Sequence, residues 1–127
     1  MLKTNTAKIS AYPAQNFALG KSTMAQYDVY VNPSRSVADG IPYVVVIQSD
    51  LLDALATRMV MPLAITNASI KTPIALCPVV MVKGQRLNAL AHFAAPMPTK
   101  LLKKPVANIA AQGSALVAAL DTVLSGI

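Results

Sequence analysis

The chain has 127 residues, of which 54% are hydrophobic, and its 11 basic and 5 acidic side chains give a formal net charge of +6. This length suits one domain with its own core, and the most apolar stretches, such as 43–47 and 116–120, are far shorter than the roughly 20 residues of a membrane-spanning helix. Half of the net charge lies before residue 24, so the rest of the chain carries only +3. This mild basicity is weak support for direct, sequence-specific binding of nucleic acid. The apolar composition predicts cover by a partner, most simply a second copy of the chain.

Residues 1–23 differ in composition from the rest of the chain. They are rich in Ser, Thr, Ala and Lys and contain no acid. Pro13, Gln15 and Asn16 interrupt the stretch in which a secretory signal would need an apolar core. The composition loosely suits an organellar transit peptide, but we favour a disordered extension or an upstream start codon. A single domain is then predicted over 24–127.

Strands are predicted to dominate from residue 24 onward. Alternation over 27–31 predicts a half-buried strand, and the β-branched run 43–48 predicts a central strand covered on both faces. Another strand is expected over 58–65, where Pro62 requires an edge position or a bulge. The acidic and apolar segment 49–57 is expected to be a loop.

A hairpin is predicted further along, because Lys83-Gly84-Gln85 is flanked by strand-like segments at 78–82 and 86–92. Pro96 and Pro98 are expected to break the chain after it. Methionines at strand positions are expected to fill the core; these are Met59, Met61 and Met81.

One helix is predicted near the end of the chain, over 110–124. Its apolar residues share a face; these are Leu116, Leu120, Val123 and Leu124. Gly113 weakens the first half of this helix, so Ser114 is the expected N-cap. Gly126 occupies the position of a left-handed C-terminal cap.

The sequence offers little for catalysis or metal binding. Its one cysteine, Cys77, excludes an internal disulfide, fits a reducing, cytoplasmic compartment and is expected to be a small buried hydrophobic residue. A triad of Ser49, His92 and Asp50 is formally available, but no nucleophile elbow surrounds the serine. Asp50 and Asp53 are expected to be solvated. With no Glu, one histidine and no phosphate-binding glycine loop, we expect no catalytic residue, no metal and no cofactor.

Two features favour an interaction surface instead. Leu51 and Leu52 stand in tandem within a polar loop. One of them could fold back into the core, but two in tandem predict that at least one stays exposed as an anchor. The chain also ends at Ser125-Gly126-Ile127 directly after the helix. Such an apolar end packs, frays or inserts into a pocket of a partner.

Several segments resemble the CcdB family of toxin–antitoxin modules. The most specific are Gln48-Ser-Asp-Leu-Leu-Asp53 and Arg58-Met-Val-Met-Pro-Leu63, which resemble the family pattern VQSD-(I/L)-(I/L)-D…R-(M/L)-V-I-P-L. Shorter similarities lie at 24–30, 76–80, 96–98, 118–121 and 126–127. Together they extend from Met24 to the end of the chain.

The resemblance implies a mainly β fold with a C-terminal helix, namely an SH3-like barrel of the CcdB type with a five-stranded antiparallel sheet and a small extra sheet. It also implies a two-fold homodimer with the helices and C-termini near the interface. Members of the family bind the A subunit of DNA gyrase and trap the enzyme on cleaved DNA. An acidic, CcdA-like antitoxin removes the toxin.

Position by position, the resemblance implies a gyrase-binding surface. Its residues are Leu51, Leu52, Asp121, Ser125, Gly126 and Ile127. The best-known member of the family has tryptophan at the position of Ser125. Because losing a buried aromatic anchor costs roughly 2 kcal/mol of binding free energy or more, we expect weaker or differently targeted binding.

Three functions remain open. The first is a toxin that poisons gyrase and catalyses no reaction of its own. The second is an endoribonuclease like the MazF and Kid toxins, which share the barrel, although three arginines and one histidine offer little for such a site. The third is a CcdB homologue that has lost poisoning and binds only its antitoxin, which Ser125 supports.

Overall fold

The computed structural model describes residues 24–52, 54–66 and 76–126. The predicted mainly β fold with a C-terminal helix is confirmed. The strands are β1 (Asp28–Val31), β2 (Tyr43–Val46), β3 (Thr57–Ile65), β4 (Val79–Val82), β5 (Gln85–Ala89), β6 (Ala95–Pro98) and β7 (Ala107–Asn108). The helix α1 spans Gly113–Ser125, and short 3-10 helices are η1 (Arg35–Asp39), η2 (Asp50–Leu52), η3 (Ala91–Phe93), η4 (Thr99–Leu101) and η5 (Ala110–Gln112). The extension expected over 1–23, Asp53 and Ile127 lie outside the described residues.

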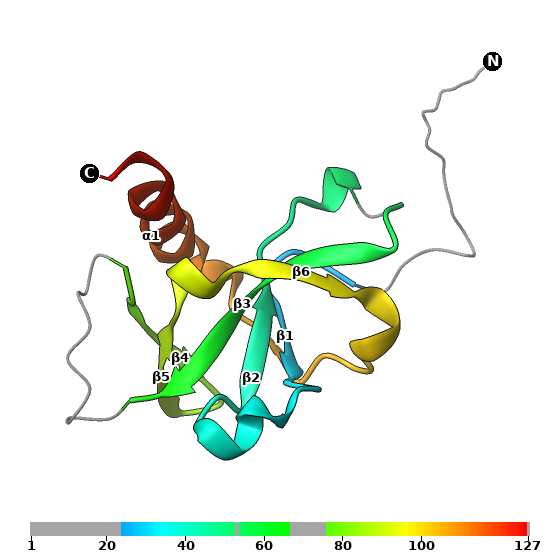
Figure 1. The fold of residues 1–127 in the computed structure, drawn as a ribbon, viewed down its shortest axis with the longest axis horizontal. Helices are drawn as coiled ribbons and strands as arrows, with labels where there is room; N and C mark the ends of the chain where they lie inside the picture. The colour runs from blue at the N-terminus through cyan, green and yellow to red at the C-terminus, as the bar shows by residue number, and fades with distance from the viewer. Residues whose placement is uncertain (1–23, 53, 67–75, 127) are drawn as a thin grey trace.

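Within the described residues, seven strands form one curled antiparallel sheet. Neighbouring strands follow the order β4-β5-β3-β2-β1-β7, while β6 pairs with the first half of β3 and β5 with its second half. Figure 1 shows α1 beside the β4–β5 end of the sheet and β6 crossing in front of β3. Because β3 pairs with three strands, it fixes the position of the loop that precedes it.

The sheet carries an apolar cluster on each face, and β1 contributes to both. Val29 belongs to the larger cluster, which α1 covers with Leu116 and Ala119. Tyr30 belongs to a smaller cluster, which Leu102 covers after η4. The expected half-buried β1 is therefore wrong, because both faces of this strand are covered. The prediction of a central strand over 43–48 is confirmed, since β2 lies between β1 and β3.

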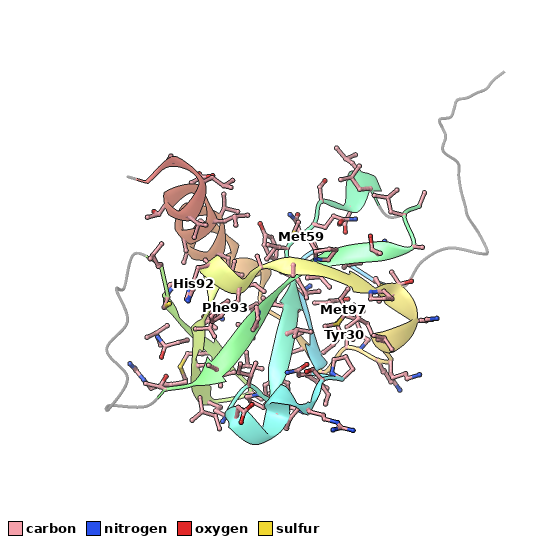
Figure 2. All side chains as sticks on the ribbon, viewed as in Figure 1. Tyr30, Met59, His92, Phe93 and Met97 are labelled. Carbon is pink, nitrogen blue, oxygen red and sulfur yellow. The ribbon has the colours of Figure 1, made fainter. Side chains whose placement is uncertain are left out.

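Only one of the three strand methionines expected in the core is buried. Met59 and Met61 share one face of β3, but the cluster beneath α1 reaches only Met61. Met59 is exposed and lies above β6 in Figure 2. Met81 is also exposed, because its side chain lies on the face of β4 opposite to the buried Val80 and Val82.

Pro62 lies inside a central strand, and the expected edge position or bulge is wrong. It pairs with Val44 of β2 in continuous register, and its carbonyl accepts a hydrogen bond from Leu90 N at 2.9 Å. The proline nitrogen therefore faces away from β2, where the partner of β3 changes from β6 to β5. Proline is tolerated there because no ladder hydrogen bond needs its missing N–H.

Pro96 and Pro98, which were expected to break the chain, lie within β6. Pro96 pairs with Met59, whose carbonyl accepts a hydrogen bond from Ile47 on the opposite side of β3. The prolines therefore occupy the positions of this ladder that do not bond to β3, and their nitrogens face the outer edge of β6. Proline fits an edge strand in this orientation.

The predicted hairpin is confirmed. Strands β4 and β5 are joined by Lys83 and Gly84, whose φ angles are 52° and 83°. Two consecutive left-handed residues form the I′ turn that matches the twist of a hairpin. Gln112 covers the outer edge of β4: its side-chain amide donates to Met81 O at 2.9 Å and accepts from Met81 N at 2.8 Å.

The helix α1 begins two residues earlier than a Ser114 N-cap would allow, with Gln112 in the N-cap position, so that expectation is wrong. The turn η5 leads directly into Gly113, and the ring of Tyr27 lies against this glycine. A Cβ at position 113 would lie 2.6 Å from Tyr27 Cζ, which explains why glycine occurs at this end of the helix. The left-handed cap at Gly126 is confirmed, with φ 74° and a hydrogen bond from Gly126 N to Thr122 O.

Candidate functional site

The connection between β2 and β3 carries the predicted leucine pair, and we call residues 48–56 the leucine loop. Its short helix η2 contains no buried residue. Leu51 is 88% exposed and Leu52 is 49% exposed. The prediction that at least one of the two is exposed is confirmed, and the alternative in which one folds into the core is wrong.

Gln48 ties the two ends of the leucine loop together. Its Oε1 accepts a hydrogen bond from Met59 N at 3.0 Å. Its Nε2 donates to Leu52 O at 3.2 Å and to Thr57 O at 3.4 Å. One amide side chain therefore links the start of the loop to η2 and to the first residues of β3.

The two residues after Gln48 fix the turn itself. Ser49 Oγ accepts a hydrogen bond from Leu51 N at 3.1 Å, and Ser49 O accepts one from Leu52 N at 3.0 Å. Asp50 Oδ1 accepts a hydrogen bond from Gln26 N at 2.7 Å, which attaches the loop to the segment before β1. Gln48, Ser49 and Asp50 thus hold the backbone, and the two leucines remain exposed.

Arg58 holds the second half of the leucine loop. Its side chain is buried, and Nη1 donates to Leu55 O at 2.7 Å and to Thr57 O at 3.1 Å. Ala56 O accepts a further hydrogen bond from Thr99 N at 2.9 Å. Leu55, which the sequence analysis did not single out, is 51% exposed on this half of the loop.

The end of α1 carries the other predicted contact residues. Asp121, Ser125 and Gly126 are exposed, and Ile127 lies outside the described residues. Ser125 Oγ donates to Asp121 O at 2.7 Å, so this hydroxyl is engaged within its own helix. Leu124 was expected on the buried face of the helix, but it is 77% exposed and adds apolar surface at the helix end.

The two groups of residues project on the same side of the molecule. Figure 1 shows the leucine loop and the end of α1 extending beyond β6, with the loop to the right and the helix to the left. Within one chain they stand apart. A partner that contacts both groups on a single chain must therefore span β6.

The comparison with known proteins identifies the family. A family model described as CcdB protein matches residues 26–126, a span that contains both the leucine loop and α1. The chain belongs to the CcdB family. It is therefore a CcdB-family toxin of a toxin–antitoxin module.

One solved structure with a similar fold is described as an endoribonuclease in complex with its cognate antitoxin, from mycobacterial species. The TM-score is 0.65 and the sequence identity 13%, over 81% of this chain and 96% of that chain. At this identity the similarity shows a shared fold. No curated protein matches the sequence.

The residues weighed for catalysis in this CcdB-family chain are not arranged as a triad. Ser49 Oγ and Asp50 Oδ1 accept backbone hydrogen bonds within and beside the leucine loop. His92 lies on η3, where its Nδ1 is 3.8 Å from the Sγ atom of the buried Cys77. Its ring stacks on Phe93 with 4.2 Å between ring centroids, and Figure 2 shows the two rings together.

The sequence analysis also missed a buried polar group on the smaller apolar cluster. Asp28, Tyr30 and Arg58 are almost fully buried there, and Asp28 accepts hydrogen bonds from Ala25 N and from Asn108 Nδ2, each at 2.9 Å. Burial, and next the charge of Asp28, raise the pKa of Tyr30, against an opposing effect of Arg58. In the sequence, Asp28 and Tyr30 alternate with apolar residues as on an ordinary exposed strand face. No sequence signal therefore distinguished this buried polar group from a solvated one.

In the part of the chain that the structure describes, no three His, Cys, Asp or Glu side chains gather where they could hold a metal ion. Over the same residues, no helix is long and apolar enough to cross a bilayer.

Proposed function

We propose that this CcdB-family toxin binds the A subunit of DNA gyrase and traps the enzyme on cleaved DNA, without catalysing a reaction of its own. The observation that carries the proposal is the exposure of Leu51 and Leu52 on a loop held at both ends by hydrogen bonds. Aliphatic side chains presented in this way fill pockets of a protein partner, and a few such contacts supply most of the binding free energy.

The end of α1 supplies the second part of the proposed contact. The sequence predicts four contact residues in this region, namely Asp121, Ser125, Gly126 and Ile127. The exposed Leu124 is added by the structure. Since the Ser125 hydroxyl donates a hydrogen bond to Asp121 O, we assign the apolar contact of this region to Leu124 and Ile127. No direct contact with nucleic acid or membrane is needed.

Two further partners belong to the proposal. A cognate CcdA-like antitoxin of acidic character suits the net charge of +6. A second copy of the chain would cover Phe93 on η3 and Val117 on α1, which are both exposed. We place the toxin in the cytoplasm, where Cys77 stays reduced, and assign the toxin domain to residues 24–127 with 1–23 as an extension.

A gyrase cleavage assay tests the function. Purified protein is incubated with gyrase, ATP and supercoiled plasmid, and in parallel with RNA. We expect linear DNA trapped on gyrase and intact RNA. Leu51→Asp should abolish trapping, because a carboxylate cannot enter an apolar pocket without losing its hydration. Deletion of Ile127 should act in the same direction.

Thermal melting distinguishes lost binding from lost folding. Leu51→Asp should melt within about 2 °C of the wild type, because substitutions of exposed side chains change stability by less than about 0.5 kcal/mol. Val31→Asp serves as the matched control and should still trap DNA. Val31 is exposed and pairs with the start of β2, whereas the leucine loop follows the end of β2. Cleaved RNA would favour the endoribonuclease alternative, and neither product would favour a homologue that binds only antitoxin.

A further inference from the structure

Leu55 stands on the second half of the leucine loop and is not among the contacts assigned above. Its side chain is 51% exposed, close to the value for Leu52. Its backbone is fixed on both sides, because Leu55 N donates to Leu52 O at 3.2 Å and Leu55 O accepts from Arg58 Nη1 at 2.7 Å. The exposure of Leu55 is therefore built into the loop.

The chemistry of the leucine loop indicates the kind of partner it fits. Its described residues carry three exposed leucines and the carboxylate of Asp50, and no cation. Anionic lipid surfaces and nucleic acids attract segments with Lys or Arg and repel a carboxylate. An apolar pocket in a protein accepts leucine without a counter-charge. The loop is thus suited to a protein surface.

The hydrogen bonds at the neck of the loop affect how binding energy is used. Gln48, Arg58 and Asp50 fix the backbone on each side of the leucines. A loop that is already ordered loses little conformational freedom on association, so more of its apolar contact contributes to affinity. The affinity should then fall when any one of the three leucine side chains is truncated.

We propose that Leu55 is a third contact with the gyrase A subunit, so that Leu51, Leu52 and Leu55 bind as one apolar unit. The inference rests on the proposed function and deepens it. With the Ser125 hydroxyl turned onto its own helix, the leucine loop becomes the larger apolar contribution that the described residues offer to that partner.

The test measures dissociation constants of full-length variants for purified gyrase A subunit. Leu55→Ala should weaken binding roughly tenfold, the effect of truncating a central apolar contact. Leu55→Met, which keeps the apolar area, should stay within about twofold of the wild type. Val31→Ala is the matched control and should leave binding unchanged. Val31 is 58% exposed and pairs with the start of β2, away from the leucine loop.

Each outcome decides between the inference and its alternatives. Binding of Leu55→Ala within about twofold of the wild type overturns the inference, and so does equal weakening by Val31→Ala. A shift of Leu55→Ala from dimer to monomer in sedimentation would place Leu55 between copies of the chain and would also overturn it. Failure of the wild type to bind the gyrase A subunit overturns the proposed function, and the inference with it. Melting temperatures confirm that each variant is folded.

Discussion

Tyr30 places a phenol inside the smaller apolar cluster, with its hydroxyl sealed from solvent. Burial is the main reason that its pKa is raised, and the charge of Asp28 adds to this effect while Arg58 opposes it. The folded chain therefore keeps the Tyr30 proton at a pH at which the unfolded chain releases it. This difference in proton binding makes stability depend on pH in the alkaline range.

The free energy of unfolding should fall as pH rises above about 10, the ordinary pKa of tyrosine, and the loss should continue up to the raised pKa of the folded state. Tyr30→Phe removes this ionisable hydroxyl, so its free energy of unfolding should fall less over the same range. At pH 7 the free energies of unfolding of the two proteins should differ by about 1 kcal/mol or less. Urea denaturation of both proteins between pH 8 and pH 11 measures the difference. Parallel curves would contradict the raised pKa.

At the same scale, the residues that could be predicted are those whose role follows from their neighbours in sequence. The tandem of Leu51 and Leu52 was enough to predict exposure. Leu55 and Leu124 could not be found in this way, because a single leucine near a loop or on a helix resembles a core residue. The exposure of Leu55 depends in part on a contact distant in sequence, the hydrogen bond from Thr99 N to Ala56 O that holds this half of the loop.

Among the elements, α1 shows how packing overrides helix propensity. Glycine is unfavourable inside a helix, yet Gly113 is the first residue of α1, because the ring of Tyr27 occupies the space of a side chain. Tyr27 itself adopts a left-handed φ of 72°. Its position is fixed by hydrogen bonds from Tyr27 N to Val46 O and from Ile109 N to Tyr27 O.

Gly113→Ala should therefore destabilise the fold by about 1–3 kcal/mol, although alanine is the better helix former by about 1 kcal/mol. The matched control is Ser114→Ala, at the next and exposed position, which should be neutral or slightly stabilising. Thermal melting compares the two variants. A higher melting temperature for Gly113→Ala would show that the Tyr27 ring moves aside without loss.

Element positions were predicted where local signals sufficed, as for the hairpin, β2 and the cap at Gly126. Two of the errors, those that concern β1 and Pro62, have the same cause. A strand can be buried on both faces, or can change partner at one residue, only because of segments distant in sequence. Such segments leave no trace in the local pattern.

For the molecule as a whole, the proposed homodimer accounts for apolar surface away from the leucine loop. Phe93 is 58% exposed on η3, which contacts α1, and Val117 is exposed on that helix. Both lie close to the elements that the family resemblance places near the two-fold axis. The mainly β architecture was predictable from the resemblance, whereas the residues of this surface were not, because Phe93 resembled an ordinary core aromatic.

If the proposed homodimer forms through this surface, Phe93→Asp should convert it to monomers, because two carboxylates would be buried across the two-fold interface. Sedimentation velocity at several protein concentrations measures the change. Val31→Asp should remain dimeric and controls for the added charge. A dimer that persists in Phe93→Asp would place the interface elsewhere on the chain.

The prolines of β6 have a consequence for a protein that displays bare leucines. The outer edge of this strand offers the carbonyls of Pro96 and Pro98 but no N–H. On the outer edge of β4, the side chain of Gln112 already bonds to the backbone N–H and carbonyl of Met81. An added strand would find few hydrogen-bonding partners along β6 or at Met81 of β4. We therefore expect the unbound toxin to resist assembly into fibrils, although its leucines are exposed.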